Sequence, residues 1–336
     1  MSQTIDNENQ FVVDLLKTLR SEKFSPQAWI HFLGRSWEMS LATANANPSL
    51  KRSWARTTIF IGTLGLAVLV VNFIFEGPNQ TLRLMPGFLF CVAWQQSDLF
   101  WHLGLNRKDG LGKLLPIVGA ANTLTWLRGL GASYLLGRLV GGLSTPSWIA
   151  LLVFLIGIVT DILDGQVARR TQTQSKLGRI ADGEADFCLY LAITLILIQN
   201  SVLPSWLGVV MLLRFLIPLI ATLGSYFLFA KPIHFGSTIW GKFAGLAQCL
   251  YFLVLLAPDQ LSFFTKFVKL PLLIATLILL IVAPIAQIVV NLPNRLVKKG
   301  KPTKHIYIQL SHLRHLCFSA TMKRKRQRSQ ERIILL

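Results

Sequence analysis

Four aspartates gather in one short stretch of this 336-residue chain, the run DILDGQVARRTQTQSKLGRIADGEAD. Asp161 and Asp164 are three residues apart, and Asp182 and Asp186 are four apart. On an α-helix, both spacings place the two side chains on one face. Long apolar runs flank the stretch on both sides. The carboxylates are therefore expected where one membrane helix ends and the next begins, and a carboxylate in such a place is a candidate functional residue.

The chemistry that these residues favour is the binding of divalent cations. Four carboxylates on two neighbouring helices repel one another, and divalent cations are the simplest compensation. Between the first and the last aspartate the chain contains no histidine or cysteine, so it offers oxygen ligands, which suit Mg²⁺ or Mn²⁺ rather than zinc. Four carboxylates are enough for two ions, which would hold the oxygens of a diphosphate during an in-line displacement. We predict that Asp161, Asp164, Asp182 and Asp186 bind Mg²⁺ or Mn²⁺ in this way.

Small residues and a cation accompany the aspartates. Gly165 and Ala168 lie on or beside the face of the first pair, where they leave room for a ligand or for another backbone. Arg169 adds a cation that suits a phosphate or a carboxylate. After a short polar loop, Gly178 opens the next helix. The stretch thus combines acidic side chains with space for a ligand.

The composition indicates that these residues are carried by a membrane protein. Hydrophobic residues make up 52% of the chain. A helix needs about 20 apolar residues to cross a bilayer. Eight runs predict such helices: residues 57–75, 84–104, 123–142, 147–167, 181–199, 205–228, 239–257 and 270–291. The second run is the weakest, because the polar sequence WQQSD interrupts it. We expect an all-α polytopic membrane protein.

Charge predicts the orientation. The chain has 34 Lys and Arg against 15 Asp and Glu, a net charge of +19. In the eight-helix arrangement most of these cations fall on one side, so the positive-inside rule places both termini and the acidic stretch in the cytoplasm. We attribute the charge to this orientation and to anionic membrane lipids, and not to nucleic acid. The four cysteines show no paired spacing and predict neither a disulfide nor a zinc site.

The chain divides into four predicted parts. Residues 1–55 form a cytoplasmic or interfacial N-terminal region, and residues 56–110 hold two additional membrane helices. Residues 115–292 form a membrane domain of six helices, and residues 293–336 form a basic cytoplasmic tail.

The N-terminal region contains one predicted helix. Ser25, followed by proline, predicts its start. Trp29, Phe32, Leu33 and Trp37 then fall along one side. This spacing fits a helix in the membrane interface, and a small soluble helical cap is the alternative.

The acidic stretch fits the pattern D-x2-D-G-x2-A-R-x8-G-x3-D-x3-D at every fixed position. This pattern resembles the signature of the CDP-alcohol phosphotransferase family, membrane enzymes of phospholipid synthesis. Upstream, NTLTWLR from Asn122 to Arg128 is similar to that family's N-x-L-T-x-x-R motif. The resemblance covers about residues 115–292. It implies a six-helix CDP-alcohol phosphotransferase core, here preceded by two extra transmembrane helices.

The resemblance also implies an activity. Family enzymes transfer a phosphatidyl group from CDP-diacylglycerol to an alcohol and release CMP, or transfer a phosphoalcohol from a CDP-alcohol to a lipid. By analogy the four aspartates hold the metals, Asp186 also takes the proton of the attacking hydroxyl, and Arg128 pairs inside the bundle. A homodimer is implied as well. The residues that correspond to the nucleotide site are Gly165, Ala168, Arg169, Ser175, Gly178, Asn122 and Thr125.

The acceptor alcohol follows from weaker signals. Arg214 inside one predicted span and Lys242 at the start of the next resemble the branch that makes phosphatidylglycerophosphate, and its cardiolipin-synthesising relatives. In that branch both cations would hold an acceptor phosphate, and glycerol 3-phosphate is the expected acceptor. Alternatively, Arg214 pairs with a motif carboxylate and Lys242 extends to the interface. Phe215 and Gly183 depart from the Glu and Pro common in that branch, so inositol phosphate, serine and phosphatidylglycerol stay open as acceptors.

Three other functions compete with this one. A transporter or channel would carry carboxylates spread along several helices, whereas here they are concentrated in one motif. A catalytically silent membrane scaffold would be indicated by loss of a motif aspartate, and none is lost. An enzyme with a CDP-alcohol donor and a lipid acceptor also fits, and its donor preference would identify it.

Overall fold

The structure is a computed structural model that describes residues 14–109, 112–229 and 239–291. The described residues up to 288 form one compact unit. The predicted basic tail, residues 293–336, lies outside the described residues.

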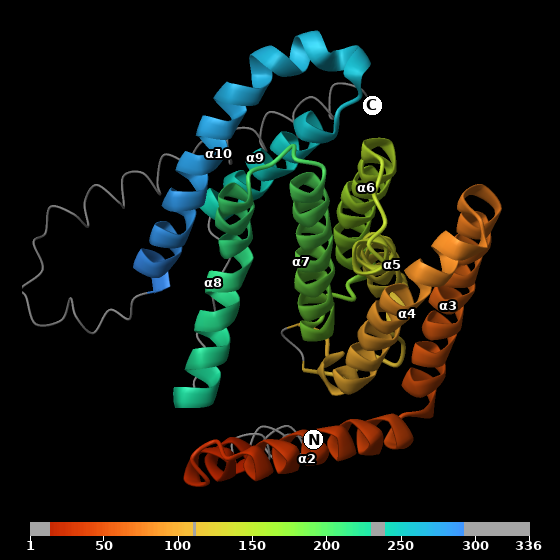
Figure 1. Cartoon of the computed structure of the whole chain (residues 1–336). Coiled ribbons are helices and arrows are strands. Elements are labelled where there is room, and N and C mark those ends of the chain that lie inside the picture. Colours follow the sequence, from red (N-terminus) through yellow and green to blue (C-terminus); the bar gives the residue numbers. More distant parts are fainter. Residues whose placement is uncertain (1–13, 110–111, 230–238, 292–336) are drawn as a thin grey trace, which may run out of the picture. The chain divides into compact units, whose positions relative to one another are not determined.

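The described chain is built from helices, as predicted (Figure 1). A short helix over residues 14–21 comes first. The long helices that follow are α2 (Pro26–Ala46), α3 (Pro48–Glu76), α4 (Pro78–Trp101), α5 (Gly119–Val140), α6 (Ser147–Thr171), α7 (Lys176–Gln199), α8 (Ser205–Phe229), α9 (Ile239–Leu256) and α10 (Ser262–Asn291). Each of the eight predicted spans falls on one of the helices α3 to α10.

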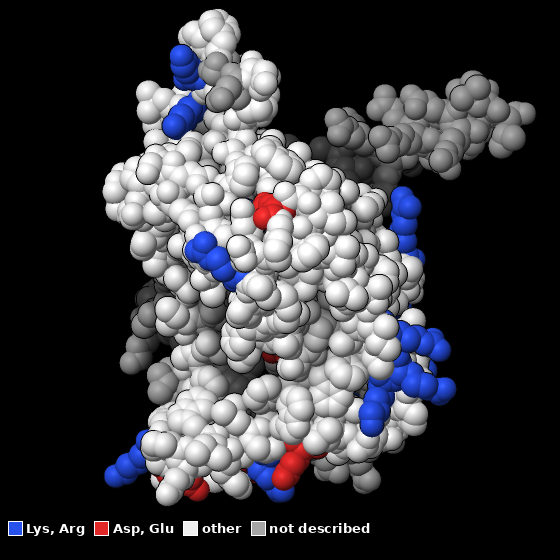
Figure 2. Space-filling view, turned by 45° about the vertical axis from the view of Figure 1, so that its right-hand side comes forward, with Lys and Arg blue, Asp and Glu red and all other residues white. Residues whose placement is uncertain are grey.

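Four of these helices are long and apolar enough to cross a membrane: α3, α6, α9 and the Thr265–Ala286 part of α10. Helix α8 has a shorter apolar segment, Ser205–Ala221. Helices α4 and α5 carry buried polar side chains such as Gln95, Gln96 and Arg128. Polar groups at membrane depth are tolerated when they face the protein interior. Neutral side chains cover most of the face drawn in Figure 2, as expected for an integral membrane protein.

Helix α2 begins where the sequence predicts. The Ser25 hydroxyl accepts a hydrogen bond from the N–H of Ala28 at 3.2 Å, and proline occupies the first turn. Two of the predicted aromatic residues pack against the far end of α8. The ring centroids of Trp29 and Phe32 lie 5.1 and 6.0 Å from that of Phe227. The N-terminal region therefore contacts the helix that carries Arg214.

The additional helix α4 packs closely against α5, the first helix of the predicted core. A Cβ atom added at Gly137 would lie 2.8 Å from the backbone nitrogen of Phe88. Small residues at such a crossing let two helix backbones approach. Further along, the Gln95 side chain donates a hydrogen bond to the Gly129 carbonyl at 3.2 Å. Gln96, the next residue of the polar interruption, instead accepts a hydrogen bond from the Thr58 hydroxyl of α3 at 3.1 Å. The polar residues of the second predicted span thus contact the neighbouring helices α5 and α3.

A buried arginine connects α5 to α3. Arg138 donates to the Glu76 carboxylate at 2.6 Å and to the Ser144 carbonyl at 2.7 Å. The Tyr134 hydroxyl, one turn earlier, donates to the side chain of Asn72 at 3.2 Å. These contacts attach α3, the first of the additional helices, to the helix that supplies Arg128.

Substitution of Gly137 by alanine tests the close approach of α4 and α5. The added methyl group meets the α4 backbone, and overpacking of this kind costs about 1–3 kcal/mol. Gly137→Ala should therefore lower the thermal unfolding midpoint in detergent. Gly62→Ala is the matched control, because a Cβ there would meet no atom within 4 Å beyond its chain neighbours and the backbone of its own helix. It should keep or raise the midpoint, since alanine favours helix. Equal midpoints for the two variants would contradict the packing.

Candidate active site

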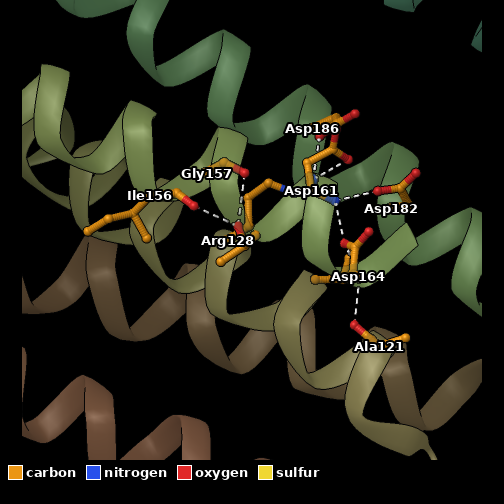
Figure 3. A network of polar contacts seen from close by, with 10 residues as sticks. Ala121, Arg128, Ile156, Gly157, Asp161, Asp164, Asp182 and Asp186 are labelled. Atoms are coloured by element: carbon orange, nitrogen blue, oxygen red, sulfur yellow. Dashed lines mark hydrogen bonds and ion pairs between the residues drawn. The ribbon is translucent and has the colours of Figure 1, made fainter. Parts of the chain in front are cut away.

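Helices α6 and α7 bring the four aspartates together (Figure 3). The turn between them has a defined geometry. Gln172 ends α6 with a left-handed φ of 53°, and Ser175 caps α7 by accepting a hydrogen bond from the N–H of Gly178 at 3.1 Å. A Cβ at Gly178 would lie 2.9 Å from the Asn122 side-chain oxygen, so any larger residue there would make that side chain move.

Arg128 of α5 lies between the four carboxylates (Figure 3). Its side chain is 1% exposed, and its Nη1 pairs with Asp161 at 2.6 Å and with Asp186 at 3.2 Å. Its Nη2 pairs with Asp164 at 3.3 Å and also with Asp182. The prediction that Arg128 pairs inside the bundle is confirmed. One guanidinium offsets one of four negative charges, so the site keeps an excess of negative charge that favours a further cation.

Three of the carboxylates form a candidate metal site. One oxygen each from Asp161, Asp182 and Asp186 lie within 4.8 Å of one another. Their side chains are 51, 45 and 32% exposed, so an ion and its water ligands can reach them. Oxygen ligands open to water fit Mg²⁺ or Mn²⁺. Asp164 differs, because it is buried and accepts a hydrogen bond from the Thr125 hydroxyl at 2.9 Å. Its metal role stays a prediction, as do those of the other three.

A small cavity of about 180 Å³ lies beside the carboxylates and is lined by Asp164 and Asp182. Arg169, predicted to bind the nucleotide, lies next to it, since a Cβ at Gly165 would be 3.2 Å from its Nη1. The other predicted nucleotide residues line the cavity: Asn122, Thr125, Gly165, Ala168, Ser175 and Gly178. The structure thus places the motif of α5 and the motif of the α6–α7 pair around the same small cavity.

The small cavity also contains residues that the sequence analysis did not single out. Thr173 and Gln174 belong to the α6–α7 turn, and Arg179 lies in the first turn of α7. Asp109 comes from the segment before α5, outside the stretch of resemblance. It is an acidic residue in an otherwise basic loop, and this contrast is the one signal that could have indicated it.

Arg214 lines a second, large cavity of about 700 Å³. Its Nη1 donates to the side-chain oxygen of Gln248 at 3.1 Å, and its guanidinium carbon lies 4.7 Å from the centre of the Phe215 ring. Within the described ranges, no hydrogen bond or ion pair joins it to a motif carboxylate. Lys242 is exposed in the first turn of α9. No contact among the described residues joins it to Arg214, although Arg214 lies against the same helix, where a Cβ at Gly245 would be 2.6 Å from its Nη2.

Comparison with known proteins agrees with this geometry. Residues 118–288, half of the chain, match the CDP-alcohol phosphatidyltransferase family. The chain therefore belongs to this family, and both the resemblance and the predicted enzyme class are confirmed. It is also 45% identical over 75 residues to the cardiolipin synthase (CMP-forming) of Streptomyces coelicolor. This match covers 22% of the chain and about a third, 34%, of the relative. No solved structure matches the chain.

Removal of Arg128 tests the charge balance of the cluster. Arg128→Met should unfold at a lower temperature than the wild type in EDTA, because breaking a buried ion pair costs about 3–5 kcal/mol. Mg²⁺ should raise the midpoint of this variant more than that of the wild type, since an ion bound to the folded state restores the missing charge. Thermal unfolding in detergent, with EDTA or with Mg²⁺, measures both effects.

Arg138→Met is the matched control, because it removes another buried arginine with a carboxylate partner. It should lose stability without an added response to Mg²⁺. An Arg128→Met midpoint that is indifferent to Mg²⁺ would contradict the assignment of the carboxylates to a cation.

Proposed function

We propose that this protein transfers a phosphatidyl group from CDP-diacylglycerol to an alcohol acceptor and releases CMP. The observation that carries the proposal is the small cavity, where the predicted nucleotide residues adjoin the aspartate cluster. The family supports the class of transfer. The printed name of the relative, a CMP-forming enzyme, supports CMP as the leaving group.

The aspartates have separate roles in the proposed reaction. The acceptor hydroxyl oxygen forms a bond to the phosphorus of the phosphatidyl group, and the bond from that phosphorus to CMP breaks. Asp186 takes the proton of the hydroxyl as general base. Two Mg²⁺ or Mn²⁺ ions held by the aspartates would offset the charge of the diphosphate. Thr125 and Arg128 hold the buried Asp164 in place beside the nucleotide.

The acceptor that we propose carries a phosphate. Arg214 is a half-buried cation on the large cavity, and the side chain after it contributes an aromatic ring and not a carboxylate. Its charge is therefore suited to an anionic group. Glycerol 3-phosphate is the proposed acceptor, and Lys242 would be a second cation for it. Phosphatidylglycerol, which also carries a phosphate, is the second candidate because the relative is a cardiolipin synthase.

We also propose that the active site and both termini face the cytoplasm. Arg169, Arg170, Lys176 and Arg179 lie at the turn between α6 and α7, next to the aspartates. Under the positive-inside rule such a basic turn is cytoplasmic. Homodimerisation and attraction of the basic tail to anionic lipids are further proposals, which rest on the family and on charge.

Asp186→Asn tests the general base. The amide keeps the size of the side chain but cannot take a proton, and loss of general-base catalysis lowers turnover by about 10²–10⁴-fold. CMP release is measured in mixed micelles with CDP-diacylglycerol and Mg²⁺, and again in EDTA. In EDTA the wild type should also lose its CMP release. Asp14→Asn removes an exposed carboxylate near the N-terminus and serves as control. Near-normal turnover of Asp186→Asn would contradict the proposed role of Asp186 as general base.

Arg214 variants test the acceptor phosphate. A hydrogen bond to a charged group contributes about 1.5–3 kcal/mol, so Arg214→Met should raise the acceptor KM about 10- to 100-fold. Arg214→Lys should be intermediate, because it keeps the charge and loses the fork of donors. The acceptors to compare are glycerol 3-phosphate, phosphatidylglycerol, inositol phosphate and serine. An unchanged KM, or serine as the preferred acceptor of the wild type, would contradict the role of Arg214.

A further inference from the structure

Arg179 connects the two cavities of the candidate active site. Among the residues that the structure describes, it is the one that lines both the small and the large cavity. It lies three residues before Asp182, so the two side chains share a face of α7. The Arg179 guanidinium therefore lies where the small and the large cavity meet, next to the candidate metal site.

The proposed donor has three parts that fit this arrangement. Its nucleoside would occupy the small cavity, which the predicted nucleotide residues line. Its acyl chains need an apolar space, and the large cavity is lined by side chains such as Trp94, Phe187 and Leu219. The diphosphate joins the two parts and must then lie at the junction of the cavities. Arg179 supplies the positive charge at that point.

Asp109 determines where the Arg179 guanidinium lies. Its carboxylate accepts from Nη1 at 2.6 Å and from Nη2 at 3.0 Å, a bidentate pair. A guanidinium has five N–H donors, so these two contacts leave others for a phosphate. The Arg179 side chain is 65% exposed, and a ligand can therefore reach it.

The segment that carries Asp109 is attached to the turn between α6 and α7. The backbone N–H of Asp109 donates to the Gln174 carbonyl at 2.9 Å. Lys108 forms an isolated β-bridge with Ser175, and its Nζ donates to the Gln172 side chain at 3.3 Å. The match to the family begins at residue 118. Chain outside the family domain therefore contributes to this site.

We propose that Arg179 binds the donor diphosphate at the junction of the two cavities and that Asp109 is its positioning residue. The inference rests on the proposed function, because it takes a CDP-linked lipid as the donor. The negative charge of Asp109 itself opposes a diphosphate. Its contribution is therefore the placement of the guanidinium, and loss of Arg179 should weaken donor binding more than loss of Asp109.

Steady-state CMP release at varied CDP-diacylglycerol, with saturating acceptor and Mg²⁺, tests the proposal. Arg179→Met should raise the donor KM about 10-fold or more, whereas the acceptor KM should stay within about twofold. Asp109→Asn should raise the donor KM less, about threefold, since the cation is kept but released from its partner. Arg170→Met removes a neighbouring exposed cation and should leave the donor KM unchanged. A donor KM for Arg179→Met within about twofold of the wild type would overturn the proposal.

The charge-swapped double variant Asp109→Arg/Arg179→Asp distinguishes a role in donor binding from a role in attaching the segment before α5 to α7. It restores an ion pair between the two segments, so thermal stability should return to near that of the wild type. The cation now lies on the other segment, so the donor KM should stay high. A donor KM restored together with stability would show that the pair is only a structural link, and would overturn the proposal.

Failure of the proposed function has a different signature. If the wild type releases no CMP with any acceptor, thermal stabilisation by added CDP-diacylglycerol is measured instead. Stabilisation that is lost in Arg179→Met supports the diphosphate contact in a protein that binds without turnover, and equal stabilisation overturns it. A wild-type protein that neither releases CMP nor responds to CDP-diacylglycerol overturns both proposals.

Discussion

Arg128 contacts four carboxylates from two helices at a place where unpaired charge is costly. Its guanidinium lets α6 and α7 present their acidic faces to each other and to α5. Because it offsets a single charge, the cluster still favours additional cations. The same interaction that holds the three helices together therefore also prepares the carboxylates for a metal. The small cavity depends on it too, since Asn122 and Thr125 precede Arg128 on α5 and line that space.

The helices outside the family domain support this arrangement from one side. Helix α4 lies close to α5 where glycines replace larger side chains, and Arg138 ties α5 to Glu76 of α3. The segment that follows α4 then reaches the turn of the acidic motif and carries Asp109 to the small cavity. The additional N-terminal helices thus pack against α5, and the segment after them contributes to the lining of the small cavity.

Local spacing made much of the site predictable. Intervals of three and four residues identify which side chains share a helix face, and this spacing singled out the four aspartates. The predicted nucleotide residues, which line the cavity beside them, came from the family resemblance and not from spacing. Periodicity does not identify the partner that faces them. Arg179 pairs with Asp109, 70 residues away, and Arg214 with Gln248, 34 residues away. Such pairs depend on how helices pack. The polar residues of the weak second span depend on packing in the same way, because Gln95 contacts α5 and Gln96 contacts α3.

The central claim is that the aspartate cluster binds a divalent cation, and electron paramagnetic resonance of Mn²⁺ added to the purified protein tests it most directly. The wild type should remove Mn²⁺ from the free, six-line signal, and Asp182→Asn should bind it much more weakly, because one of the three adjacent ligand oxygens loses its charge. Asp14→Asn should behave as the wild type does. Equal Mn²⁺ binding by the wild type and Asp182→Asn, or no binding by either, would contradict the account.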